Sequence, residues 1–254
     1  MPSQRVYFEN EAGIRLAGIL DLPQETSKTF ALFSHCFTCT KDLKAIVRIS
    51  RGLARHGIGV LRFDFTGLGD SQGNFSKSNF ESNLVDIQSA ANWLRDNYSA
   101  PQLLLGLSLG GAAMMASTHA VESAKAIATL AAPSCTHHLA EFLAQTNPEI
   151  ESSGAGEVVI GGRTHLMTSQ LLDSLRRFDL KKEIEGIEIP HLILHSPADE
   201  TLDYRHAEIL FELTGGPKSL LTLSGADHLM VNQPQDVGYV ADMIAGWTFR
   251  QLDF

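Results

Sequence analysis

The feature that most constrains the fold is an alternation of short apolar runs with segments of helical periodicity. The apolar runs lie at 30–35, 59–65, 101–108, 124–132, 191–196 and 219–225. Between and after them, apolar residues recur at helical spacing at 42–56, 84–94, 110–120, 204–213 and 234–249. Continuous apolar runs are typical of strands buried on both faces, and this alternation is typical of a parallel sheet covered by helices.

Two further strands are predicted at the start, at 5–9 and 14–22, joined by a hairpin turn at 10–13. The prediction is an α/β fold with a mostly parallel eight-stranded sheet, helices on both faces and an antiparallel first pair of strands. Ser78 and Glu81 form an S-x-x-E pattern, which predicts a capping box at the start of the helix that follows.

The composition fits this globular class. The chain has 254 residues, of which 44% are hydrophobic, which is too many for a disordered chain. The formal net charge is −9, and no basic region offers a face to nucleic acid. The first residues have neither a basic region nor an apolar run, and no apolar stretch is long enough to span a membrane. We expect no nucleic-acid partner and no membrane association.

The number of cysteines bears on the redox environment of the protein and so on its location in the cell. The three cysteines, Cys36, Cys39 and Cys135, are too few for a disulfide framework, which favours a reduced, cytoplasmic protein. Cys36 and Cys39 form a C-x-x-C pattern that either acts in redox or metal chemistry or supplies small buried side chains. The second interpretation is favoured, because a zinc site needs a second pair and Cys135 stands alone.

One segment interrupts the alternation. Residues 133–189 separate two predicted core strands by far more than one crossover helix needs. A hairpin at 157–167, turning on Gly161 and Gly162, and a helix at 168–178 lie within this segment. We predict a single domain over residues 1–254, with 133–189 inserted as a small cap.

The first chemical motif is Gly-Leu-Ser-Leu-Gly at 106–110. It follows a predicted strand and opens a predicted helix, which is the context of a nucleophile elbow. Gly106, Gly110 and Gly111 supply the small residues that such a sharp turn needs. Ser108 is therefore the predicted nucleophile, although a glycine-rich turn with an idle serine gives the same pattern.

A serine hydroxyl needs a base, and the chain offers ten histidines. His228 lies just after the last predicted strand, where a loop can return over the sheet. His195 ends a strand and is interpreted as a core or turn residue, and His35 as a residue that orders its loop. We predict His228 as the base.

The histidine in turn needs a carboxylate. Asp199 follows the second-last strand by a short loop, which favours it over Asp203, a predicted helix N-cap, and over Asp227, which should point away from its neighbour His228.

An oxyanion hole requires two N–H donors. One is predicted at Leu109, directly after the nucleophile. The other should lie in the loop at 34–42, where Phe37 is favoured and Cys36 and Thr38 are alternatives. The glycines of segment 64–73 do not have dinucleotide-binding spacing, and Asp64 and Ser71 are predicted to hold a turn there.

These motifs together resemble the α/β-hydrolase superfamily over essentially the whole chain. The sequences GLSLGG, DFTGLGDS, PADET and GADH occur in the expected order. The segment at 34–73 and the hairpin at 157–167 resemble, more narrowly, the hydrolase half of bacterial fusions with an OsmC-type domain. The chain stops at Phe254, after the last predicted helix, so we expect no OsmC-type domain in it.

The resemblance implies serine esterase activity on small or short-acyl esters through Ser108, Asp199 and His228, with an acyl-enzyme and no cofactor or metal. The same residues serve a thioesterase, amidase or peptidase, and a non-catalytic ligand-binding protein of this fold remains the third alternative. We expect the segment 133–189 to supply apolar pocket walls from Phe142, Leu166, Met167 and Leu171.

Overall fold

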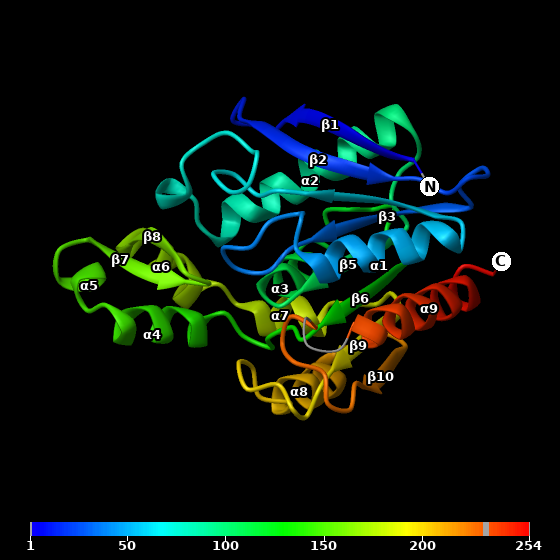
Figure 1. Cartoon of the computed structure of the whole chain (residues 1–254). Coiled ribbons are helices and arrows are strands. Elements are labelled where there is room, and N and C mark those ends of the chain that lie inside the picture. The colour runs from blue at the N-terminus through cyan, green and yellow to red at the C-terminus, as the bar shows by residue number, and fades with distance from the viewer. Residues whose placement is uncertain (1, 231–233, 254) are drawn as a thin grey trace.

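The computed structural model describes residues 2–230 and 234–253. An eight-stranded sheet runs through the molecule in the order β1-β2-β4-β3-β5-β6-β9-β10 (Figure 1). β1 pairs antiparallel with β2 and β2 antiparallel with β4, and the other pairs are parallel. The strands are β1 (Ser3–Glu9), β2 (Arg15–Asp21), β3 (Thr29–Ser34), β4 (Ile58–Phe63), β5 (Leu103–Leu107), β6 (Ala126–Leu130), β9 (His191–His195) and β10 (Lys218–Thr222). The predicted fold class and strand content are confirmed.

Helices cover both faces of the sheet. The five strands β3, β4, β5, β6 and β9 are therefore buried along their whole length. One core lies beneath α1 (Lys44–Arg55) and α9 (Pro234–Gln251), which pack against each other. The other core lies beneath α2 (Phe80–Asn97), α3 (Leu109–Ala116), α7 (Leu180–Glu185) and α8 (Arg205–Leu213). This arrangement places the carboxyl ends of the parallel strands at one edge, where α/β sheets bind ligands.

Most of the segment predicted as a cap projects beside the sheet (Figure 1, left). It contains α4 (His137–Thr146), α5 (Glu149–Ser152), the antiparallel hairpin of β7 (Ala155–Ile160) and β8 (Arg163–Thr168), and α6 (Ser169–Arg177). The hairpin turns at Gly161 and Gly162, both with positive φ, as the sequence predicts. Helix α7 returns to the body of the molecule and packs on α3.

The capping box predicted from Ser78 and Glu81 is wrong. The N-cap of α2 is Asn79, whose side chain accepts from the Ser82 N–H at 2.8 Å, while the Ser82 hydroxyl accepts from the Asn79 N–H. Ser78 instead donates to the Phe75 carbonyl, and Glu81 accepts from the Ser174 hydroxyl. Asn at the N-cap accepts from the free N–H groups of the first turn as well as Ser does, so the helix is capped equally well one residue further along.

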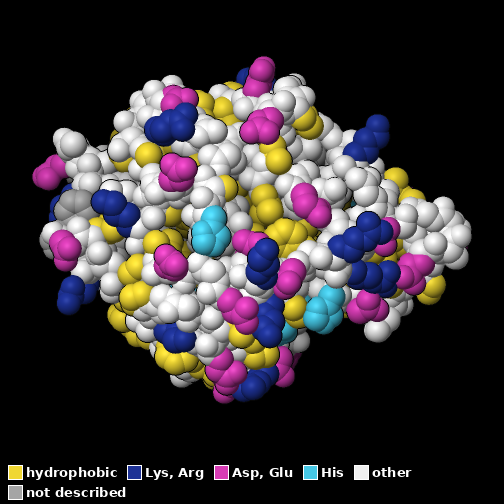
Figure 2. Space-filling model, turned by 180° about the vertical axis from the view of Figure 1, so that it is seen from behind, with side chains coloured by type: hydrophobic (Ala, Val, Ile, Leu, Met, Phe, Trp, Pro, Cys, Tyr) yellow, Lys and Arg dark blue, Asp and Glu magenta, His cyan; other side chains and the backbone are white. Residues whose placement is uncertain are grey.

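The surface carries charge of both signs. On the face seen in Figure 2, acidic and basic side chains are interspersed, and the cap region projects at the side. Among the described residues, no helix is long and apolar enough to cross a bilayer.

Candidate active site

Ser108 stands on a sharp turn between β5 and α3. Its φ of 54° lies in the left-handed region, which is strained for a residue with a Cβ and is typical of functional turns. The turn closes only because its neighbours are glycines: a Cβ on Gly106 would overlap the backbone of Gly110 and Gly111. The nucleophile elbow predicted from the sequence thus has the backbone conformation that such a turn requires.

Three loops at the carboxyl edge of the sheet bring Ser108, His228 and Asp199 together. The Ser108 Oγ lies 3.0 Å from Nε2 of His228, and Nδ1 of His228 lies 2.7 Å from Oδ2 of Asp199. A carboxylate only accepts, so Nδ1 carries the proton and Nε2 presents its lone pair to the serine hydroxyl. The three residues form a continuous hydrogen-bonded chain from hydroxyl to carboxylate.

Asp199 is held as a carboxylate by its surroundings. Oδ1 accepts from the N–H groups of Thr201 and Leu202, each at 2.9 Å, and Oδ2 also lies 3.3 Å from Nε2 of His195. Burial raises the pKa of Asp199, but hydrogen bonds from His195, His228 and Leu202 outweigh it and hold the pKa well below its usual range. The carboxylate therefore stays ionised beside His228.

The structure separates Asp199 from its competitor. Asp203 is exposed, and its Oδ1 accepts from the Arg205 N–H at 2.7 Å at the start of α8, where Tyr204 is the N-cap. The predicted N-cap at Asp203 is therefore wrong by one residue, although the Asp203 carboxylate still accepts an N–H at the beginning of the helix.

The loop after β3 packs closely on the start of α3. A Cβ on Gly110 would overlap the carbonyl oxygens of Ser34 and His35, and the Ser34 hydroxyl donates to the Gly110 carbonyl at 2.8 Å. Phe37 and Leu109, whose N–H groups are the predicted oxyanion donors, line one pocket. Within the described residues, no hydrogen bond from the Phe37 N–H occurs, so this donor is available to a ligand.

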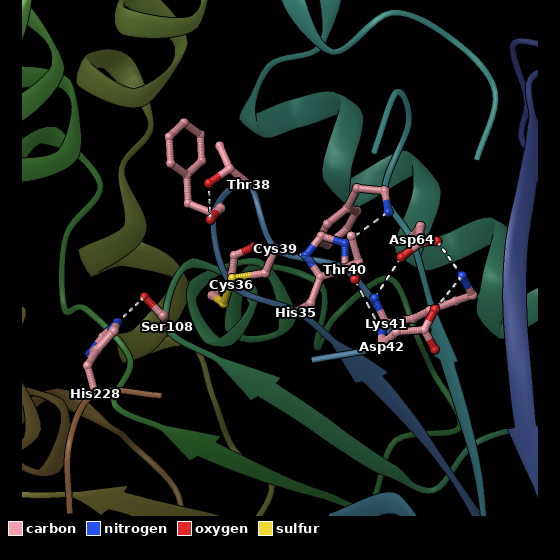
Figure 3. The surroundings of a disulfide bond; sticks show 12 residues. His35, Cys36, Thr38, Cys39, Thr40, Lys41, Asp42, Asp64, Ser108 and His228 are labelled. Carbon is pink, nitrogen blue, oxygen red and sulfur yellow. Dashed lines mark hydrogen bonds and ion pairs between the residues drawn. A yellow bond between two sulfur atoms is a disulfide. The ribbon is translucent and has the colours of Figure 1, made fainter. Parts of the chain in front are cut away.

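Cys36 and Cys39 form a disulfide across this loop, with their Cα atoms 5.3 Å apart (Figure 3). The expectation of reduced cysteines is therefore wrong for this pair, while Cys135 is free. The tight turn of the loop brings the two sulfur atoms together, which spacing in the sequence does not show. The cysteines thus no longer support a cytoplasmic location.

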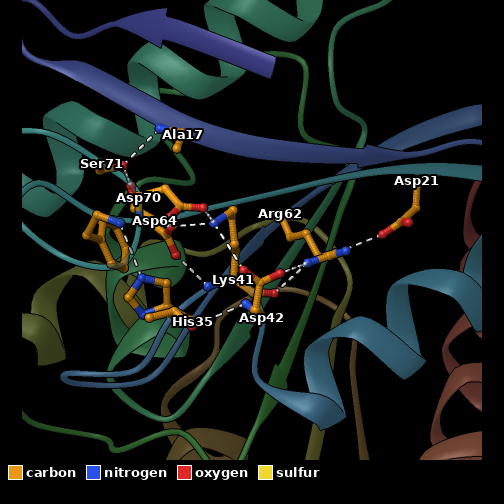
Figure 4. Close-up of polar contacts among 11 residues, drawn as sticks. Ala17, Asp21, His35, Lys41, Asp42, Arg62, Asp64, Asp70 and Ser71 are labelled. Atoms are coloured by element: carbon orange, nitrogen blue, oxygen red, sulfur yellow. Dashed lines mark hydrogen bonds and ion pairs between the residues drawn. The ribbon is translucent and has the colours of Figure 1, made fainter. Parts of the chain in front are cut away.

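Beneath the loop lies a network of charges centred on the buried side chains of Lys41 and Asp64 (Figure 4). Lys41 Nζ contacts Asp64 and Asp70, each at 2.7 Å, and Asp64 also accepts from the Lys41 N–H at 2.6 Å. Burial lowers the pKa of Lys41, but hydrogen bonds to Asp64 and Asp70 raise it further than burial lowers it. Ser71 donates to the Asp64 carbonyl at 2.7 Å, so Asp64 and Ser71 hold a turn as the sequence predicts.

The pocket beside Phe37 and Leu109 has about 370 Å³ of unfilled space, part of it open to solvent. Its walls are mainly aromatic and aliphatic, with polar Ser78, Asn79 and Asn83 among them. The aromatic and leucine wall residues are Phe37, Phe65, Leu68, Phe75, Phe80, Leu109, Leu171 and Leu175.

The four residues predicted to line the pocket lie in different places in the structure. Leu171 lines this pocket, Leu166 lines a separate surface groove with His165, Met167 is fully buried in the core, and Phe142 is 55% exposed on α4. Phe65, Phe75 and Phe80 were not predicted as wall residues from the sequence. The sequence reasoning also missed the contact of His195 with Asp199, for which the four-residue spacing in HSPAD was the available signal.

Comparisons with known proteins agree with this architecture. Residues 40–151 match the family Hydrolase_4, described as serine aminopeptidase, S33. The chain is 36% identical to the esterase domain of a Rhodothermus marinus protein, with a TM-score of 0.79 and coverage of 98% of this chain and 99% of that one.

Two more distant relatives share the arrangement or the sequence. Est1E of Butyrivibrio proteoclasticus, in a structure with ferulic acid bound, is 19% identical with a TM-score of 0.85, covering 98% of this chain and 100% of that one. The uncharacterized protein YfhR of Escherichia coli O157:H7 is 26% identical over 234 residues, which are 89% of this chain and 74% of that protein. Because the identity with the Rhodothermus marinus esterase domain extends over nearly all of both chains, this chain belongs to the α/β-hydrolase superfamily and is an enzyme of the serine-hydrolase type.

Proposed function

We propose that this enzyme hydrolyses small carboxylic esters, with Ser108 as nucleophile, His228 as general base and acid, and Asp199 as the orienting carboxylate. The observation that carries the proposal is the chain of two hydrogen bonds, 3.0 Å from Ser108 to His228 and 2.7 Å from His228 to Asp199. Both distances lie in the range that proton transfer between nucleophile, base and carboxylate requires.

In the first half-reaction, Ser108 Oγ attacks the ester carbonyl carbon while Nε2 of His228 takes the hydroxyl proton. Asp199 stabilises the imidazolium that forms, and it stays ionised itself. The tetrahedral intermediate then collapses, His228 returns the proton to the leaving alcohol, and the acyl group remains on Ser108.

In the second half-reaction, water attacks the acyl-enzyme with His228 again as the base, and the carboxylic acid leaves. In both halves negative charge develops on the former carbonyl oxygen. The N–H groups of Phe37 and Leu109 are the proposed donors to this oxygen. Leu109 is the first residue of α3, so the positive end of the helix dipole also lies near the charge. Such donors stabilise the transition state by several kcal/mol, on the order of 3 to 4 kcal/mol each.

The pocket supports a small acyl or alcohol group. Part of its unfilled space of about 370 Å³ is open to solvent, so the enclosed part is smaller than that. Aromatic walls with a few polar groups favour a short chain or a single ring over a long acyl chain.

The family match favours a second candidate, hydrolysis of peptides or other amides, because the matching family is described as serine aminopeptidase. Thioesters would use the same residues. The walls of the site, and not the triad, decide between these substrates.

The test compares nitrophenyl esters of rising chain length with a matched thioester and a matched anilide, for the wild type and Ser108→Ala. We expect the highest kcat/KM for short esters and a loss of at least about 10³-fold in Ser108→Ala. Faster cleavage of the anilide would favour the peptidase alternative, and equal rates for the wild type and Ser108→Ala would contradict the proposal.

A further inference from the structure

We propose that the Cys36–Cys39 disulfide positions the oxyanion donor Phe37, so that kcat depends on the thiol–disulfide state of this pair. The proposal rests on the ester-hydrolase function proposed above. Figure 3 shows the disulfide beside Thr38, on the loop that faces Ser108 and His228.

The disulfide closes a tight turn around the donor. The Cys39 N–H donates to the Cys36 carbonyl at 3.1 Å, so Phe37 and Thr38 occupy the two central positions of a β-turn. The disulfide joins the first and last residues of that same turn. The disulfide is therefore a covalent cross-link between the ends of the four-residue turn that contains the proposed donor.

The turn is strained at Thr38. Its φ of 57° lies in the left-handed region, which costs a β-branched residue on the order of 1–2 kcal/mol. Turns with a positive φ at this position usually have Gly or Asn there. A turn with Thr needs an external constraint to keep this shape, and the disulfide supplies one.

The orientation of the Phe37 N–H follows from the carbonyl group of the same peptide unit. The Cys36 carbonyl accepts from Cys39 N–H and also from Nδ1 of His35 at 2.8 Å. Nδ1 of His35 carries the proton because its Nε2 accepts from the Phe65 N–H at 3.2 Å. In a trans peptide the C=O and N–H point in opposite directions, so fixing the carbonyl fixes the direction of the Phe37 N–H.

The disulfide is accessible from one side. Cys36 is only 4% exposed, whereas Cys39 is half-buried. A thiolate of a dithiol attacks Sγ of Cys39, the bond to Sγ of Cys36 breaks, and Cys36 leaves as a thiolate that takes up a proton. The second thiol of the reagent then releases Cys39 as a thiol and forms the reagent's own disulfide, so two electrons and two protons pass to the protein.

Reduction of the disulfide leaves the hydrogen bonds of the turn but removes the covalent cross-link. Thr38 can then relax toward negative φ, which moves the Phe37 N–H away from the oxyanion. Loss of one oxyanion donor lowers kcat by about 10²–10³-fold. Because the hydrogen bond from His35 remains, we expect a smaller effect, a fall in kcat of about ten- to a hundredfold with KM nearly unchanged.

The experiment compares the protein oxidised and after treatment with dithiothreitol that is then removed under argon. Hydrolysis of phenyl acetate is followed by acid release, and kcat is expressed per active site titrated with an organophosphate. Alkylation and mass spectrometry report the state of each cysteine. The pH profile of kcat/KM is recorded for both forms, and its acid limb should not move because Ser108, His228 and Asp199 are untouched.

Two variants separate positioning from stability. Cys36→Ser/Cys39→Ser should have the low kcat of the reduced protein and no response to dithiothreitol, while Cys135→Ser should respond as the wild type does. Adding Thr38→Gly to the double variant should recover much of the lost kcat, because Gly adopts this φ without strain.

The outcomes are distinct. Absence of Ser108-dependent hydrolysis in the oxidised protein would overturn both the proposed function and this inference. Equal kcat per active site in the two forms, or free thiols at Cys36 and Cys39 in the oxidised protein, would overturn this inference alone. A fall in kcat that Thr38→Gly does not recover, together with a lowered melting temperature, would assign the cysteines to stability and also overturn it.

Discussion

Nε2 of His195 lies 3.3 Å from Oδ2 of Asp199, the same oxygen that His228 contacts at 2.7 Å. Nε2 of His195 also lies 3.0 Å from the Leu202 carbonyl, so Nε2 carries the proton and His195 is a donor to the carboxylate. His195 and His228 therefore both donate a hydrogen bond to the same oxygen of the Asp199 carboxylate.

Replacing His195 with Leu should raise the pKa of Asp199 and lower kcat. The hydrogen bond from His195 is one of those that hold this pKa low, and it also fixes the position of the carboxylate. We expect kcat, measured by steady-state ester kinetics, to fall about tenfold from poorer orientation of Asp199. His56→Gln is the control, because His56 pairs with Asp242 between α1 and α9. A kcat of His195→Leu that equals that of the wild type would contradict this role.

The assignment of the carboxylate is tested by Asp199→Asn and Asp203→Asn. An amide at position 199 donates where a carboxylate accepts, which favours the wrong tautomer of His228 and lowers kcat by on the order of 10⁴-fold. Asp203 accepts from the Arg205 N–H, and an Asn oxygen does the same, so this variant should keep kcat within about twofold. Steady-state kinetics with one ester measures both, and a larger loss in the Asp203 variant would reverse the assignment.

Much of this site follows from spacing along the chain. Ser108, Asp199 and His228 each lie in the segment that follows a strand of the parallel part of the sheet, and the carboxyl ends of such strands meet at one edge. Local patterns therefore predicted which three side chains approach one another. Asp199 was separable from Asp203 because Asp203 stands next to the start of the following helix, whereas Asp199 lies nearer the end of the strand.

Other features depend on contacts that spacing does not encode. Two neighbouring residues, Ser78 and Asn79, both suit an N-cap, and in the structure α2 begins after Asn79. The Cys36–Cys39 bond depends on a turn with Thr38 in an unusual conformation. The pocket walls were wrong for Met167 because the side of the hairpin that faces the core depends on how segment 133–189 folds back.

The close packing of the loop after β3 on α3 predicts a sharp effect of Gly110→Ala. The added Cβ would overlap the carbonyl oxygens of Ser34 and His35, which are backbone and cannot turn aside. The loop must move, so kcat should fall at least tenfold and the free energy of unfolding by about 1–3 kcal/mol.

Gly246→Ala is the matched control for this substitution. Gly246 lies exposed within α9, and nothing lies within 4 Å of its would-be Cβ. This change should leave kcat unchanged and stabilise the protein by about 0.5–1 kcal/mol. Denaturant unfolding and ester kinetics give both quantities, and equal behaviour of the two alanine variants would contradict the packing argument.

Buried His191 predicts acid sensitivity of the fold. Burial lowers the pKa of His191 from 6.5 to about 3, and its ring is bonded to the hydroxyls of Thr129 and Thr214. Between pH 6.5 and about 3 the unfolded chain takes up a proton that the folded state refuses. Stability therefore rises with pH across this window, by up to about 1.4 kcal/mol per pH unit.

The variant His191→Gln, which cannot titrate, should lose that part of the slope. Urea unfolding at several pH values measures it, and exposed His119→Gln is the control because it should keep the wild-type slope. A slope that is the same in wild type and His191→Gln would show that His191 does not titrate as its burial implies.

The most direct test of the account is to locate the acyl group. The protein is mixed with nitrophenyl acetate, quenched in acid within the first turnover, digested and analysed by mass spectrometry. The account predicts one acetyl group on the peptide that contains Ser108, and no acetyl group there in Ser108→Ala, which also loses hydrolysis. Continued hydrolysis by Ser108→Ala, or hydrolysis by the wild type with Ser108 never acetylated, would contradict it.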